Sequence, residues 1–163
     1  MNREGKTLRY APIRPVHDAT MAAIVRAALK AHHLDIPGTA YFDPSLDSLS
    51  AYYHSPGRAY DVLLENGTVI GGVGVAAFED LPGCCELQKL YLDERARGRG
   101  LGYDMIRHIE DKARALGYER IYLETHTNLA AAIHEYERSG YGRIERPPSV
   151  IHTAMNRFYR KEL

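Results

Sequence analysis

The sequence is poor in cysteine, has no long apolar run and carries no excess of either charge. Its 163 residues include two cysteines, and 21 basic side chains balance 21 acidic ones. This balance argues against a general binder of nucleic acids or membrane surfaces. No stretch reaches the length of a membrane span, and the polar stretch 1–6 has no apolar core of a secretory signal. We therefore expect a cytoplasmic protein with no nucleic-acid and no membrane partner.

The two cysteines and the histidines favour no metal site. Cys84 and Cys85 are neighbours, so a disulfide between them would be strained, and two thiols cannot complete a zinc site alone. His32 and His33 are also adjacent, and adjacent positions on a helix do not face one site. We expect both cysteines to be small, partly buried side chains in a reducing compartment. Neither cysteine sits in an obvious setting for a nucleophile, because no paired histidine lies nearby in sequence.

The pattern of apolar residues predicts a single α/β (α+β) domain over residues 1–163. Asn66-Gly67 between two apolar runs is typical of a tight hairpin, and Gly117 and Gly140 are natural helix ends. We expect a mixed, twisted sheet of about six or seven strands flanked by helices, with an antiparallel first half. Strands are expected at 7–13, 60–64, 68–78, 85–92, 120–124, 141–144 and 153–162, and helices at 17–31, 44–53, 100–116 and 129–138.

A glycine-rich loop connects the strand ending at Leu92 to the helix that begins near Gly100. Its sequence is Arg97-Gly98-Arg99-Gly100-Leu101-Gly102. A loop at a helix N-terminus points several backbone N–H groups at one spot, and glycines let a ligand approach the backbone closely. Arginines at 95, 97 and 99 suit an anion. A pyrophosphate is the natural occupant of such a loop.

Other phosphate-binding loops fit this stretch less well. The Gly-Lys-Ser/Thr triplet of a P-loop is absent here, and the dinucleotide pattern G-x-G-x-x-G fails because Tyr103 follows Gly102. Two alternatives stay open on these residues: a turn that binds nothing, and an unrelated α/β fold whose loop binds a different nucleotide.

The loop resembles the pyrophosphate loop of the GNAT superfamily of acyl-CoA-dependent N-acetyltransferases, whose signature is Q/R-x-x-G-x-G/A. The signature fits residues 95–100 and residues 97–102, and the distance from Leu92 favours the second frame. A second segment resembles a later one of the family, with an asparagine before a helix that carries Ala-Ile and Tyr-Glu and ends at Gly-aromatic; here it runs over residues 123–141. The resemblance covers residues 60–146 closely. Asp93-Glu94 departs from it, because many relatives have a proline there.

The resemblance implies an N-acetyltransferase that moves the acetyl group of acetyl-CoA, the acyl-donor substrate, to an amine by direct transfer in a ternary complex. The acceptor is a small-molecule or peptide amine that the sequence does not identify. A non-catalytic acyl-CoA-binding sensor on the same fold is the alternative. Many relatives dimerise through late strands, so a homodimer is a further expectation.

The resemblance also suggests the catalytic residues. Tyr136 is expected to act as the acid that protonates the departing thiolate, because a phenol in an apolar site stays protonated at neutral pH. Glu86 is the first candidate for the base and Glu124 the second, each directly or through water. Since Leu87 should face the core, Glu86 and Gln88 should share the opposite face of their strand.

The donor is expected to lie along the same strand and loop. The backbone of Leu90, Tyr91 and Leu92 should bind the pantetheine arm, and Asn128 should contact the donor or cap the following helix. The pyrophosphate should be held by Arg97, Gly98, Arg99, Gly100, Leu101, Gly102 and Tyr103. On the acceptor side, the candidates that could also be packing, surface or capping residues are Tyr41, Phe42, Tyr52, Tyr53, His134 and His152.

Overall fold

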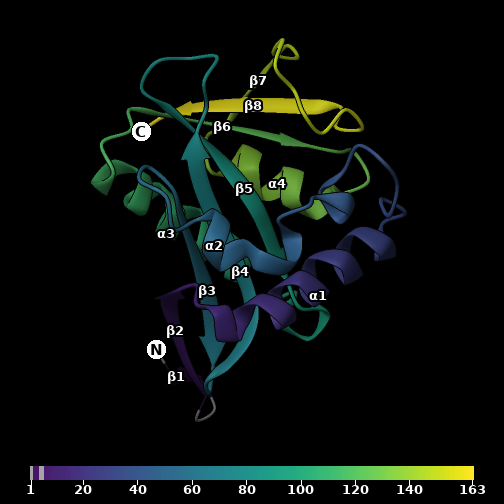
Figure 1. Ribbon diagram of the computed structural model, residues 1–163, viewed down its shortest axis with the longest axis vertical. Helices are drawn as coiled ribbons and strands as arrows, with labels where there is room; N and C mark the ends of the chain where they lie inside the picture. The colour runs from purple at the N-terminus through teal and green to yellow at the C-terminus, as the bar shows by residue number, and fades with distance from the viewer. Residues whose placement is uncertain (1, 4–5) are drawn as a thin grey trace.

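A twisted sheet of eight strands runs through the computed structural model, which describes residues 2–3 and 6–163 (Figure 1). The strands lie in the order β1-β2-β3-β4-β5-β6-β8-β7. Neighbours pair antiparallel except β5 and β6, which are parallel, so the antiparallel first half is confirmed. The strands are β1 (Asn2–Arg3), β2 (Lys6–Pro12), β3 (Ala59–Glu65), β4 (Thr68–Ala77), β5 (Cys84–Leu92), β6 (Arg120–Thr125), β7 (Gly142–Ile144) and β8 (Arg157–Glu162). The two-residue β1 was not expected.

Helices cover both faces of the sheet (Figure 1). One face carries α1 (Pro15–Ala31) and the short α2 (Leu49–Tyr52), and the other carries α3 (Leu101–Ala115) and α4 (Ala130–Arg138). The apolar stripe of α3 is fully buried at Met105, Ile106 and Ile109, which pack against the sheet. No helix among the described residues is long and apolar enough to cross a bilayer.

The hairpin between β3 and β4 forms where the sequence predicts it. Asn66 and Gly67 both have positive φ, 50° and 82°, which is the backbone of a tight turn that matches the twist of the strands. The register pairs Glu65 with Thr68. The turn was predicted from two neighbouring residues, and the structure confirms this prediction.

Two expected elements differ in the structure. The strand expected at 153–162 begins only at Arg157, because the Ala154 N–H donates to the Gly38 carbonyl and turns this segment toward another loop. The helix expected at 44–53 is divided into a 3-10 turn, η2 (Leu46–Ser48), and the single turn of α2. Two further 3-10 turns are η1 (Ala40–Phe42) and η3 (Glu94–Ala96).

The parallel pair of β5 and β6 opens along its length. The two strands are paired from Cys84 to Glu86 on β5, and in the described chain no pairing between them continues beyond that point. A bulge in β5 sets Lys89 and Leu90 against the single residue Val73 of β4, and Lys89 has a φ of 50°. The Tyr60 hydroxyl fixes the bulge by donating to the Lys89 carbonyl over 2.7 Å. The edge of β5 beyond Glu86 is thereby left open toward β6.

Candidate active site

A cleft of about 310 Å³ lies where β5 and β6 separate. The open edge of β5 forms one wall, and the beginning of α3 and the inner side of α4 form the other. Because no strand of the described residues pairs with this edge of β5, its backbone groups can bind a ligand. The cleft is lined by Ala28, His32, Leu87, Lys89, Leu90, Tyr91, Leu92, Arg97, Gly98, Gly100, Leu101, Gly102, Glu124, Thr125, Leu129, Ala131, Ala132, Glu135, Tyr136 and Met155.

The glycine loop has the geometry of an anion-binding turn. Gly98 and Gly100 both have a φ of 74°, a conformation that favours glycine. A Cβ atom added to either residue would meet no atom of residues 2–3 and 6–163 within 4 Å, so the space beside the loop is open. The N–H groups of Gly98 and Gly100 donate to no other described residue. The loop can therefore receive a ligand on its backbone.

The N-terminus of α3 adds to this site. Gly100 is its N-cap and no side chain of the described residues caps the helix, so the first-turn N–H groups remain available to an anion. Arg97 lines the cleft, is exposed, and forms no ion pair with another described residue. Arg95 lies nearby but is 83% exposed and bound to Asp93 at 3.0 Å. These residues fit a pyrophosphate group.

Three residues expected to bind the donor do not line the cleft. Arg99 pairs with Glu65 of β3, and the Tyr103 hydroxyl donates to the Arg138 carbonyl at the end of α4. The Asn128 side chain donates to the His32 carbonyl over 3.0 Å. The idea that Asn128 caps the next helix is wrong, because the N-cap of α4 is Leu129.

Gly102 of α3 lies against the carboxylate of Glu135 on α4. A side chain at position 102 would collide with the end of the Glu135 side chain, which would have to shift. Glu135 lines the cleft and forms no hydrogen bond or ion pair through its side chain with another described residue. Burial raises its pKa. An unpaired carboxylate thus faces the end of α3 where the loop can bind an anion.

Glu86 is a half-buried carboxyl group on β5. As predicted, Leu87 packs into the core beneath α3 and α4, while Glu86 and Gln88 share the opposite face of the strand. Burial and the nearby Glu124 together raise the pKa of Glu86 to about 7. Gln88 opposes this by donating to Glu86 over 2.9 Å. A carboxyl group with this pKa can exchange a proton at neutral pH.

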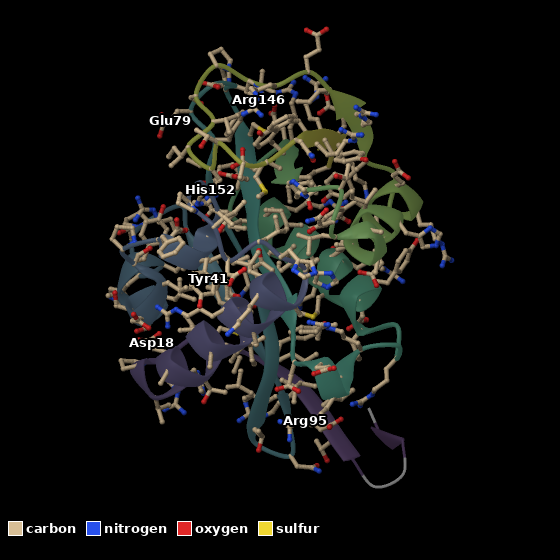
Figure 2. All side chains as sticks on the ribbon, turned by 90° about the vertical axis from the view of Figure 1, so that its right-hand side faces the viewer. Asp18, Tyr41, Glu79, Arg95, Arg146 and His152 are labelled. Atoms are coloured by element: carbon tan, nitrogen blue, oxygen red, sulfur yellow. The ribbon has the colours of Figure 1, made fainter. Side chains whose placement is uncertain are left out.

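Glu124, at the open end of β6, belongs to a chain of polar contacts. The Tyr122 hydroxyl donates to Glu124 over 2.8 Å, and His152 Nδ1 lies 3.4 Å from its other carboxylate oxygen. His152 Nε2 lies 2.8 Å from Asp43, which also pairs with Lys89 at 2.8 Å. In Figure 2, His152 lies above Tyr41 on one side of the molecule, with Arg95 far below.

His152 is held as a cation. Burial alone would lower its pKa, but hydrogen bonds to Asp43 and Glu124 outweigh burial and raise the pKa to about 9. His152 and Lys89 lower the pKa of Asp43 against the effect of its burial. The His152 side chain therefore connects the loop before β8 to Asp43 at the end of η1 and to Glu124 near the end of β6.

A second, smaller pocket of about 50 Å³ adjoins the cleft on the side of Glu86. It is lined by Leu29, Ala40, Glu86, Leu87, Gln88, Lys89, Tyr91, Glu124, His152 and Met155. Leu87, Lys89 and Tyr91 of β5 line both the cleft and this pocket, as do Glu124 and Met155. One molecule in the cleft and another in the small pocket would therefore meet at β5.

Tyr136 lies in the wall of the cleft on α4. It is 6% exposed and its ring packs against Tyr141, with 5.9 Å between the ring centroids. Its hydroxyl makes no hydrogen bond with another described residue, and burial, with Tyr91 and Glu135, raises its pKa far above the usual range. The phenol is therefore protonated at neutral pH and available to a ligand in the cleft.

The cysteines are poor nucleophiles. Cys84 and Cys85 are both buried, and burial raises their pKa values to about 11 and about 12. Since the thiolate is the reactive form, neither side chain is activated at neutral pH.

Sequence reasoning missed part of this site. Asp43 and Lys89 were not singled out, although their ion pair borders the small pocket. Tyr53 and His152 were named only as possible acceptor contacts. Each of these contacts joins segments far apart in the sequence, and no local pattern carries such a signal.

Comparison with known proteins gives consistent matches. The Acetyltransferase (GNAT) family model matches residues 26–141. The uncharacterized N-acetyltransferase YjgM of Escherichia coli is 39% identical over 109 residues, which are 66% of this chain and 65% of that protein. The match thus spans just under two thirds of the length of this relative.

Solved structures share the fold at low sequence identity. An acetyltransferase of the GNAT family from Staphylococcus aureus Mu50 superposes with a TM-score of 0.84 at 18% identity, covering 96% of this chain and 99% of its own. The putative acetyltransferase yncA of Salmonella typhimurium, solved with acetyl-CoA, has a TM-score of 0.75 at 19% identity and covers 96% and 94%.

Proposed function

Because the chain belongs to the GNAT family of acetyltransferases, we propose that it transfers the acetyl group of acetyl-CoA to the amine of a small-molecule or peptide acceptor. One observation carries the proposal: the separation of β5 from β6 joins a cleft that ends at an anion-binding loop to a pocket that contains Glu86. A donor and an acceptor have separate places that meet at one strand.

The donor fits the cleft by its chemistry. Its pyrophosphate would be held by the N–H groups at the start of α3 and by Arg97. Its pantetheine amides would bind the free backbone edge at Leu90, Tyr91 and Leu92. The acetyl-CoA bound to the Salmonella yncA protein supports this donor.

The acceptor amine reaches the site as an ammonium ion and must lose a proton before it can attack. Glu86, with a pKa of about 7, accepts that proton directly or through water. Glu124, which borders both the cleft and the small pocket, is the second candidate for this role.

The neutral amine then attacks the acetyl carbonyl carbon. The new C–N bond forms and the C–S bond breaks with its electron pair on sulfur. Tyr136 donates a proton to this sulfur, and the nitrogen gives up its second proton, which restores the phenol through solvent. One proton is released overall. Transfer is direct, because the thiol groups of Cys84 and Cys85 are buried and protonated.

Thermal unfolding with acetyl-CoA, coenzyme A, ATP and NAD titrated separately tests the donor site. A ligand at a hundredfold excess over its Kd stabilises the fold by ~2.7 kcal/mol. We expect acetyl-CoA and coenzyme A to raise the unfolding temperature, and ATP and NAD to leave it unchanged. Arg97→Gln should reduce this shift, and Arg95→Gln, which removes an arginine outside the cleft, should not.

The outcomes of this titration separate three readings. A shift with ATP or NAD in place of coenzyme A would contradict the assignment of the loop. A shift with coenzyme A but no turnover of any amine would identify a non-catalytic acyl-CoA sensor.

A further inference from the structure

Two carboxyl groups and two cations line the small pocket beside Glu86. The carboxyl groups are those of Glu86 and Glu124, and the cations are Lys89 and His152. Asp43 does not line the pocket, but its carboxylate binds both cations. If the donor occupies the cleft, the acceptor amine must enter this pocket to reach the acetyl group. Its charges therefore decide which acceptor can enter.

Both cations are already bound by carboxylates of the protein. Lys89 Nζ lies 2.8 Å from Asp43 and its side chain is 8% exposed. His152 Nε2 lies 2.8 Å from the other oxygen of Asp43, and its Nδ1 lies 3.4 Å from Glu124. The backbone of Lys89 is fixed in the β5 bulge by the hydrogen bond from Tyr60. A carboxylate on the substrate would therefore have to compete with Asp43 for either cation.

Glu86 has the opposite character. Its side-chain partner among the described residues is the Gln88 amide, and no cation of the described chain forms an ion pair with it. The Gln88 amide is itself held by the Tyr53 hydroxyl at 2.6 Å, so it cannot turn away. The site thus presents one carboxyl group whose natural partner is a cation brought by the substrate.

We propose that the acceptor is a cationic primary amine that carries no carboxylate next to its amino group. This inference rests on the proposed function. A free α-amino acid would place its own carboxylate within one carbon of the ammonium group, facing Glu86 and Glu124, with both pocket cations engaged by Asp43. Like charges opposed in a partly closed site disfavour binding strongly.

Matched pairs of acceptors test the proposal. Phenethylamine with phenylalanine, agmatine with arginine, and tryptamine with tryptophan differ only by the carboxylate. The methyl ester of each amino acid restores a neutral group at that position. We expect kcat/KM for the amine to exceed that for the free amino acid by about 100-fold, with the ester close to the amine. Calorimetric binding of the same compounds to the coenzyme A complex gives a second readout that does not require turnover.

A charge variant gives an independent check. Asp43→Asn leaves the Lys89 ammonium without the carboxylate that pairs with it, so the preference for the amine should fall by about tenfold or more. The matched control is Asp47→Asn, which removes an exposed carboxylate paired with Arg26 outside the pocket and should leave the preference unchanged.

The results separate this inference from the proposed function. If amino acids react or bind as well as the amines, the inference is overturned while acetyl transfer stands. If coenzyme A binds to the protein but no amine or ester reacts, the proposed function fails, and the calorimetric preference still decides the charge of the acceptor.

Discussion

The side-chain amide of Gln88 donates a hydrogen bond to Glu86, with 2.9 Å between Nε2 and Oε1. The carbonyl oxygen of the same amide accepts from the Tyr53 hydroxyl over 2.6 Å. This second bond fixes which end of the amide faces the carboxylate. Glu86 is therefore held in one orientation at the small pocket, with a pKa of about 7.

The first prediction concerns activity. Glu86→Gln keeps the size of the side chain but cannot accept a proton, so kcat/KM should fall by about 10²-fold or more. In the wild type, kcat/KM should rise with pH through about 7 as Glu86 ionises, and this limb should disappear in the variant. Glu79→Gln, at an exposed turn, is the control. If kcat/KM of the variant still rises with pH through about 7, the base is Glu124 or water.

The second prediction concerns stability. Glu86 has its pKa raised from 4.5 to about 7, so its favourable contribution is present below pH 4.5 and is lost as pH rises through 7. The unfolding free energy of Glu86→Gln minus that of the wild type should therefore increase by up to ~3 kcal/mol when the pH is raised from 4 to 8. Urea unfolding of both proteins at pH 4 and pH 8 measures this difference. The same difference at both pH values would contradict the prediction.

The third prediction concerns His152. Its pKa is raised from 6.5 to about 9 by hydrogen bonds that outweigh its burial. Its stabilising contribution is therefore complete below pH 6.5 and is lost as pH rises through 9. The difference in Tm between the wild type and His152→Gln should shrink from pH 6 to pH 10. His134→Gln, at a helix surface position outside these contacts, should show a constant difference.

The fourth prediction concerns Glu135. Its carboxylate lies against Gly102 at the beginning of α3, where the pyrophosphate is proposed to bind. Glu135→Gln removes a like charge and should tighten coenzyme A binding by about three- to tenfold. Pantetheine, which has no pyrophosphate, should bind equally to both proteins. Weaker coenzyme A binding by the variant would show that Glu135 contacts the donor favourably.

Local patterns predicted much of the fold. The Asn66-Gly67 turn, the buried stripe of α3 and the glycine loop after β5 each depend on residues close in sequence, and the structure has all three. The alternation on β5 placed Leu87 in the core and Glu86 on the opposite face.

Contacts between distant segments could not be predicted from local sequence patterns. The bond between His152 and Asp43 spans 109 positions, and it depends on a loop that turns because Ala154 binds Gly38. The β5 bulge is similar, because no local rule puts a lysine at positive φ. Asn128 shows how a helix end can shift by one residue: a typical capping residue donates to His32 instead.

The most direct test of acetyl transfer is the rate at which free thiol appears from acetyl-CoA, measured with and without an amine, for the wild type and Tyr136→Phe. We expect amine-dependent thiol release with one acetylated amine per thiol. The variant should lose about 10²-fold in kcat while its Kd for coenzyme A stays unchanged, because the phenol donates only to the departing sulfur. Thiol release that does not depend on the amine, or an equal kcat in the variant, would contradict this account.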